Sequence, residues 1–261
     1  MRHVALCLAL VAALQGDEDK IAKLKAPQVV AKAQPAWAKR KGCHFKAEIA
    51  STLLSKEGFA EETIGFEGTL VRDFAAFHGS AEIYARGREK LIKAKDGSFA
   101  EPVKTDGQIN RTGVITRNPA LLLAEFFRFF GAAAYGGDEK IGEFDCRIIE
   151  TAADERSLVD QVKEVSGGLK RLEAFFIKDL TAVTDRKKST SVYRVWVSRT
   201  DFTVARIDWA LTIVVNKKNI PFEPDKVPDQ HELKYSYTFS KFDTELQIDV
   251  PAAVRSVLGA P

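Results

Sequence analysis

The sequence predicts an α+β fold that is mainly antiparallel β, and three observations support this prediction. Apolar and polar residues alternate over long stretches of the first and last thirds of the chain, as in strands with one face in water. Polar turn signals separate these stretches, and only a few segments have helical spacing. No Pro-, Gly- or Ser-rich linker divides the 261 residues, so we expect a single β domain over residues 42–261.

The first residues have the layout of a secretory signal peptide. A short basic start precedes the uncharged, mostly apolar residues 4–16, and charge returns abruptly at Asp17. This apolar stretch is shorter than the roughly 20 residues of a membrane-spanning helix. We therefore expect residues 1–16 to be removed and the protein to be exported to the periplasm or the cell exterior.

A charged lead-in follows over residues 17–41, which are rich in Lys, Ala and Gln and interrupted by Pro27 and Pro35. We expect it to be partly helical. The whole chain has 39 Lys and Arg against 36 Asp and Glu. This near balance argues against a nucleic-acid binder, which usually has a clustered basic excess.

Two cysteines, Cys43 and Cys146, are left once residues 1–16 with Cys7 are removed. An even pair in an exported chain favours a disulfide, which here would close a loop of about one hundred residues. Two unpaired buried thiols are the alternative.

The first strand is predicted at residues 43–49, where apolar and polar side chains alternate. Further strands are predicted at residues 63–71, 81–86 and 90–95, because turn signals such as His-Gly-Ser at 78–80 and Asp-Gly-Ser at 96–98 separate them. The order of these segments is that of a meander.

An unusually apolar helix is predicted between Asn118 and Gly131. Asn118 suits the N-cap and Pro119 the first helical position, while Gly131 suits the end. Apolar residues cover most of its circumference, so this helix must be enclosed on several sides or contact an apolar ligand. An amphipathic helix is predicted at residues 154–165, and a short one at 169–176.

The C-terminal third has the clearest strand pattern. Residues 193–198 and 202–215 are β-branched or aromatic stretches around a polar turn, and they predict a hairpin. A long strand is predicted at residues 233–239, and a final one at 246–250, before Pro251.

Catalytic and metal-binding patterns are weak in this chain. His44, His78 and His231 are widely spaced, which does not support a zinc site. Cys43 and His44 are neighbours on a strand and point to opposite faces, so they do not form a nucleophilic pair. We expect no catalytic, metal or cofactor site. The basic residues 186–188, Arg-Lys-Lys, predict an exposed turn or, alternatively, a contact with anionic lipid headgroups.

Four C-terminal segments occur in a recognisable order. They read Val-Tyr-Arg-Val-Trp-Val-Ser-Arg at residues 192–199, Arg-Ile-Asp-Trp-Ala-Leu at 206–211, Lys-Tyr-Ser-Tyr-Thr-Phe-Ser-Lys-Phe-Asp at 234–243, and Leu-Gln-Ile-Asp-Val-Pro at 246–251. In this order they resemble the end of the LolA/LppX-like lipoprotein-carrier superfamily. The resemblance implies a curved open sheet, or half-barrel, with a few helices capping its concave side and a cavity for acyl chains between them.

The resemblance also implies ligand-binding residues on the strands and on the helical cap. The sequence supplies candidates for both, namely Trp209, Leu211, Tyr235, Tyr237 and Phe239 on strands, and Phe126, Phe127 and Phe130 on the cap. Core packing is the alternative role for the Phe-rich cap.

We therefore expect an exported, non-enzymatic binder or carrier of an apolar ligand, such as a lipid or a lipoprotein acyl chain. An envelope lipoprotein or a membrane surface are candidate partners. The alternative is a structural or protein-interaction module of the cell envelope, in which the same aromatic residues only fill a closed core. An exported hydrolase ranks third.

Overall fold

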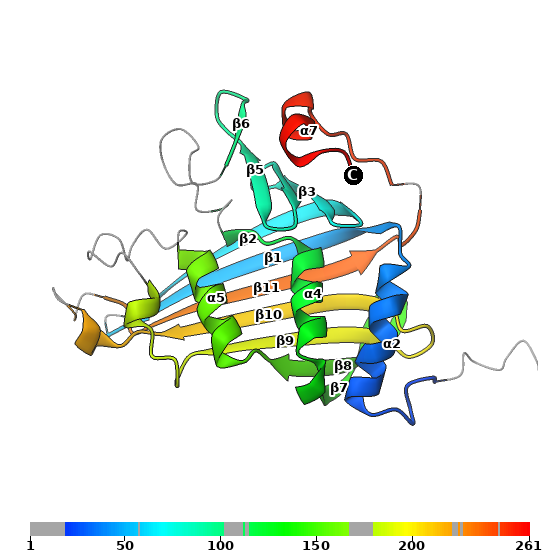
Figure 1. The fold of residues 1–261 in the computed structure, drawn as a ribbon, viewed down its shortest axis with the longest axis horizontal. Coiled ribbons are helices and arrows are strands. Elements are labelled where there is room, and N and C mark those ends of the chain that lie inside the picture. The colour runs from blue at the N-terminus through cyan, green and yellow to red at the C-terminus, as the bar shows by residue number, and fades with distance from the viewer. Residues whose placement is uncertain are drawn as a thin grey trace, which may run out of the picture.

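The computed structural model describes residues 19–56, 58–101, 112, 115–166, 180–220, 224, 227–244 and 246–261. These residues form one antiparallel sheet of 11 strands in the order β6-β5-β4-β3-β2-β1-β11-β10-β9-β8-β7 (Figure 1). The predicted α+β class with a curved, open, mainly antiparallel sheet is confirmed. The strands are β1 (Gly42–Ser55), β2 (Gly58–Val71), β3 (Phe74–Gly79), β4 (Ile83–Arg86), β5 (Glu89–Lys93), β6 (Phe99–Ala100), β7 (Ala134–Ile141), β8 (Phe144–Ala152), β9 (Thr190–Ser198), β10 (Val204–Val214) and β11 (Gln230–Ser240).

The two ends of the sheet-forming chain meet in the middle of the sheet. Strand β1 pairs with β2 on one side and with β11 on the other. Along β1 the residues Phe45, Ala47 and Ile49 are buried on one face, as the alternating pattern predicted. This long-range pairing joins the strands predicted at residues 43–49 and 233–239 side by side in one sheet.

Helices α2 (Ala26–Ala38), α4 (Pro119–Arg128) and α5 (Glu155–Ser166) lie across one face of the sheet (Figure 1). We call this the inner face and the opposite side the outer face. Asn118 caps α4 as predicted, because its side-chain oxygen accepts a hydrogen bond of 2.9 Å from the Ala120 backbone N–H. Helix α5 matches its predicted range within one residue at each end.

The lead-in contributes to the core through α2. Val29, Val30 and Ala33 of this helix are at most 1% exposed and belong to the large cluster between sheet and helices. Trp37 packs on Phe239 of β11, with ring centroids 5.0 Å apart. The partly helical lead-in is therefore part of the packed core through α2.

The predicted final strand at residues 246–250 is wrong. These residues belong to no strand and lead into α7 (Ala252–Leu258). Val250, Val254 and Leu258 are buried on the outer face against Phe74, Tyr84 and Leu91. The alternating pattern thus belongs to a segment that packs on the sheet through Ile248 and Val250 without joining its hydrogen-bonded ladder.

The predicted disulfide is not formed, since Cys43 and Cys146 are both free buried thiols. Cys43 lies on β1 and Cys146 on β8, with β11, β10 and β9 between them. Four strand spacings of about 4.8 Å exceed the roughly 7 Å that a disulfide allows between Cα atoms. The alternative of two buried thiols is the correct one.

Two predictions lie outside the described residues, the signal peptide at residues 1–16 and the short helix at 169–176. Among the helices in the described part of the chain, none has the length and apolar character needed to cross a membrane.

Candidate functional site

Aromatic side chains form a row on the inner face of the sheet. Trp209 on β10 pairs in register with Tyr193 on β9 and with Tyr235 on β11, so the three side chains share one face. Their ring centroids are 6.1 Å apart for Tyr193 and Trp209, and 4.8 Å apart for Trp209 and Tyr235. Tyr237 follows two residues after Tyr235 on the same face. We call these four residues the aromatic row, and each is at most 1% exposed.

Residues 115–118 cover the aromatic row before α4 begins. The Tyr235 and Tyr237 hydroxyls donate hydrogen bonds of 2.6 Å to the backbone oxygens of Ile115 and Arg117. The Trp209 indole N–H donates to Ser191 Oγ at 2.8 Å. Burial raises the pKa of both tyrosines, so their hydroxyls stay protonated and act as donors.

A buried ion cluster joins the two helices above the row. The Arg117 guanidinium contacts Glu125 of α4 at 2.9 and 3.2 Å and Glu164 of α5 at 2.9 and 3.1 Å. Its side chain is 2% exposed, against 7% for Glu125 and 24% for Glu164. Burial opposes the charge, but Glu164 and Glu125 outweigh it and raise the pKa of Arg117. We call Arg117, Glu125 and Glu164 the ion cluster.

The ion cluster is also fastened to the sheet. The Tyr193 hydroxyl donates to Glu125 Oε2 at 2.6 Å and accepts a hydrogen bond of 2.7 Å from the Gln161 side chain of α5. Helices α4 and α5 and strand β9 therefore converge on one polar network inside an otherwise apolar layer. One acceptor of this network is left over, because the buried Gln161 Oε1 atom has no hydrogen-bond partner among the described residues.

The predicted ligand-binding residues come together in one core. Phe126, Phe127, Trp209, Leu211, Tyr235, Tyr237 and Phe239 all belong to the cluster between sheet and helices. Phe127 is the most exposed of them, at 7%. The side chain of Phe130 lies outside the described residues. The described candidates thus pack into one buried core.

Sequence reasoning missed the ion cluster and Tyr193. One signal was present, because Glu125 is the only acidic residue in a helix of Leu, Ala and Phe. A lone carboxylate on an apolar helix needs a buried cation or hydrogen-bond donors. The cation itself lies eight residues earlier in the chain, and Glu164 is brought in only by the fold.

The histidines lie apart from one another. His231 on the inner face has its Nε2 atom 2.9 Å from Ser51 Oγ, while His44 Nδ1 lies 3.3 Å from Thr69 Oγ1. In the part of the chain that the structure describes, no three His, Cys, Asp or Glu side chains gather as metal ligands.

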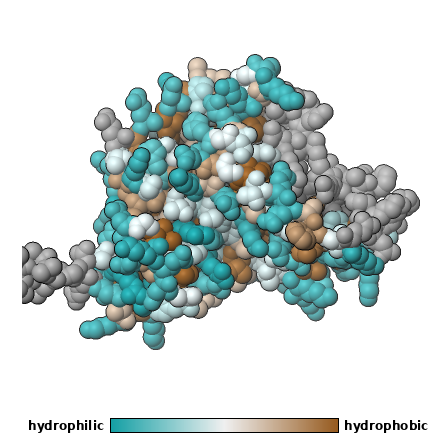
Figure 2. Space-filling view, turned by 180° about the vertical axis from the view of Figure 1, so that it is seen from behind, coloured by the Kyte–Doolittle hydropathy of each residue, from teal (hydrophilic) through white to brown (hydrophobic). Residues whose placement is uncertain are grey.

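A trough of about 540 Å³ lies on the outer face, where Figure 2 shows mostly hydrophilic residues with scattered apolar ones. Its floor has the short side chains of Ala50, Val192 and Ala210. These share a row, because Ala210 pairs with Val192 and Lys234, and Lys234 pairs with Ala50. The trough therefore follows a row of short side chains that only Lys234 interrupts.

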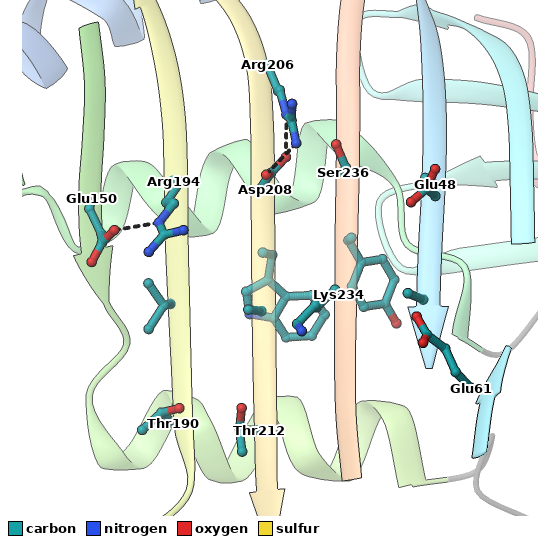
Figure 3. A pocket seen from close by; sticks show the side chains of 15 residues that line it. Glu48, Glu61, Glu150, Thr190, Arg194, Arg206, Asp208, Thr212, Lys234 and Ser236 are labelled. Carbon is teal, nitrogen blue, oxygen red and sulfur yellow. Dashed lines mark hydrogen bonds and ion pairs between the residues drawn. The ribbon is translucent and has the colours of Figure 1, made fainter. Parts of the chain in front are cut away.

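The cations beside this trough are paired with carboxylates across or along the strands, whereas Glu48 and Glu61 form no ion pair with a described residue (Figure 3). Arg206 binds Asp208 with two contacts of 2.8 Å, and Arg194 contacts Glu150 at 2.5 Å. Lys234 lies 3.1 Å from Glu232. Cations with carboxylate partners are typical of a solvated sheet surface, so the enclosed inner face is the better candidate site.

Comparison with protein-family models and with curated proteins gives no match. Solved structures do match over most of the chain. The lipoprotein LppX from Mycobacterium tuberculosis is 13% identical with a TM-score of 0.38, covering 85% of this chain and 99% of that one. LprF from Mycobacterium bovis is 10% identical with a TM-score of 0.37, covering 88% and 97%. A LolA superfamily protein from Nitrosomonas europaea is 12% identical with a TM-score of 0.25, covering 87% and 96%. Proteins of the group that the C-terminal segments resemble in sequence are thus among these structural matches.

Proposed function

We propose that this protein is an exported, non-enzymatic carrier of an apolar ligand, a lipid or an acyl chain, in the periplasm or cell envelope. The ligand would lie between the aromatic row and helices α4 and α5. The described structure would then be the closed state of the carrier. The layout of residues 1–16 supports export.

The observation that carries this proposal is the placement of the ion cluster. One guanidinium holds carboxylates of two separate helices directly above the aromatic row. A buried ion pair fixes geometry strongly but adds little net stability compared with apolar packing. Helices α4 and α5, which the ion cluster joins, would act as a lid with a defined closed position. Moving these helices would uncover the apolar surface of the aromatic row.

The uncovered surface suits a hydrocarbon chain. The aromatic row crosses three neighbouring strands, a span of roughly 10 Å at the spacing of a sheet. Each methylene buried against such a surface contributes about 0.8 kcal/mol. A chain of ordinary acyl length would therefore bind usefully without a polar recognition motif.

The test is lipid extraction from protein purified without detergent, followed by mass spectrometry, together with uptake of a fluorescent fatty acid. We expect a co-purified lipid or saturable uptake by the purified protein. Repeated recovery of ligand-free protein that takes up no fatty acid would contradict the proposal.

A second function, a structural or protein-interaction module of the envelope, is favoured by the dense packing of the candidates. Trp209, Tyr235 and Phe126 are at most 1% exposed in one continuous cluster. A core that never opens would show the same buried aromatic residues as the closed state of a carrier. The two functions differ in whether the aromatic row becomes accessible to an added acyl chain.

A further inference from the structure

One end of the sheet combines exposed apolar and basic side chains. At the tip of the β1–β2 hairpin Leu54 is 37% exposed and Phe59 is 72% exposed. They pair directly across the two strands, so they form one small apolar patch on the outer face. Few large apolar side chains of the described residues are this exposed. Core packing accounts for neither of them.

Basic residues lie at the same end of the sheet, two to three strand spacings or roughly 10–14 Å from Leu54. Gln230 pairs with Leu54 on one side and with Val214 on the other. The Asp185 N–H donates to the Val214 oxygen at 2.8 Å, which places the exposed turn 185–188 next to the strand ends. The 3-10 helix η4 (Lys217–Asn219) directly follows β10. This is the left end of the sheet in Figure 1, and we call it the tip end.

The tip end has cations available for an anionic partner. Arg186, Lys188 and Lys217 have acidic neighbours at 3.9, 3.6 and 2.7 Å. Lys187 and Lys218 are exposed and form no ion pair with any described residue. Asp229 is an acidic neighbour of Leu54, because its backbone N–H donates to the Leu54 oxygen at 2.8 Å, and its carboxylate is paired with Lys217. On β2, Glu61 and Glu62 lie roughly 7 Å or more along the strand from Phe59.

We infer that the tip end docks on a lipid bilayer that contains anionic lipids. Phe59 and Leu54 enter the boundary between headgroups and acyl chains, while Lys187 and Lys218 contact lipid phosphates. Apolar insertion combined with basic side chains is the usual design of a peripheral membrane contact. A stable protein partner needs about 800 Å² from each side, and two apolar side chains at a hairpin tip offer far less.

This docking is independent of what the interior binds, because Leu54 and Phe59 lie on the outer face and the aromatic row on the inner face. The experiment is co-sedimentation of the protein with vesicles of phosphatidylcholine, with and without phosphatidylglycerol, in the absence of added fatty acid. We expect binding that requires phosphatidylglycerol and weakens as salt is added.

Two variants test the apolar part and the basic part of the membrane contact separately. Phe59→Ser should lower vesicle partitioning about tenfold or more, given the apolar area of a phenyl ring. The double variant Lys187→Glu and Lys218→Glu should lower it by roughly fivefold or more for each lysine replaced. Because these side chains are exposed, the variants should keep the fold, which circular dichroism checks.

Matched controls come from exposed residues away from the tip. Val257→Ser removes a side chain on α7 that is 62% exposed, and Lys95→Glu with Lys140→Glu makes the same change in net charge. Both controls should bind vesicles like the wild type. Wild-type protein that stays in the supernatant overturns the inference, and so do control variants that bind as weakly as the tip variants. A dimer seen by analytical ultracentrifugation and dissociated by Phe59→Ser would make a second copy the partner instead.

Discussion

The Arg117 guanidinium lies over the indole ring of Trp209, with its Cζ atom 4.3 Å from the ring centroid. This is a cation–π contact inside the core, where little water competes with it. The same guanidinium holds Glu125 and Glu164, so one side chain couples both helices to the sheet. Both helices are therefore positioned on the sheet through one buried cation.

Replacing Arg117 should destabilise the protein strongly. Arg117→Met leaves the Glu125 carboxylate buried without its cation, which costs about 3–5 kcal/mol in comparable cases. Urea unfolding followed by circular dichroism measures this. Glu164→Gln is the matched comparison and should cost clearly less, because the Glu164 side chain is 24% exposed and water can replace part of its contact. Equal losses for the two variants would contradict the described arrangement.

Lys90 should make stability depend on pH between about 8 and 10.5. Burial lowers the pKa of Lys90 from 10.5 to about 8, although Glu164 opposes the shift. The unfolded chain binds more protons in this window, so the contribution of Lys90 to the free energy of unfolding rises with pH. The free energy of unfolding of the Lys90→Met variant should therefore exceed that of the wild type by the largest amount below pH 8. This excess should disappear towards pH 10.5. A difference in free energy of unfolding between the two proteins that stays constant from pH 8 to 10.5 would contradict the lowered pKa of Lys90.

Cys43 and Cys146 should react as two buried thiols. Burial raises the pKa of each to about 12, so almost no thiolate exists at pH 8 in the folded protein. We expect slow modification by N-ethylmaleimide in the native state and rapid modification of both residues in guanidinium chloride without a reductant. Peptide mass spectrometry locates the labels. Modification that requires prior reduction would show a disulfide instead.

Much of the sheet could be predicted because its strands have one buried and one wet face. β10 and β11 alternate cleanly, and their apolar positions are the ones that face the helices. β7 has no such pattern, since it is an edge strand with exposed residues and two glycines, formed by pairing with β8. Residues 246–250 have the pattern without a partner strand. Alternation of apolar and polar residues indicates that one face of a segment is buried. It does not indicate that the segment is hydrogen-bonded to a neighbouring strand.

The candidate site could be predicted only in its apolar part. Trp209 and Tyr235 are evident from their strands, because aromatic residues at alternating positions indicate one buried face. Arg117 precedes Asn118 and Pro119, and a charge beside such a pair looks like an ordinary exposed turn residue. Its burial follows from Glu164, which is 47 residues away in sequence. Pairings over such distances have no local signal.

The most direct test of the carrier proposal is fluorescence quenching by dibromostearic acid in two single-tryptophan variants. Trp209 lies on the inner face, while Trp196 of the neighbouring strand lies in a separate cluster on the outer face. The variant with Trp37→Phe and Trp196→Phe reports on Trp209, and the variant with Trp37→Phe and Trp209→Phe reports on Trp196. We expect saturable quenching of Trp209 with little change at Trp196. Equal quenching of both tryptophans, or none at Trp209 in folded protein, would contradict the binding of an acyl chain on the aromatic row.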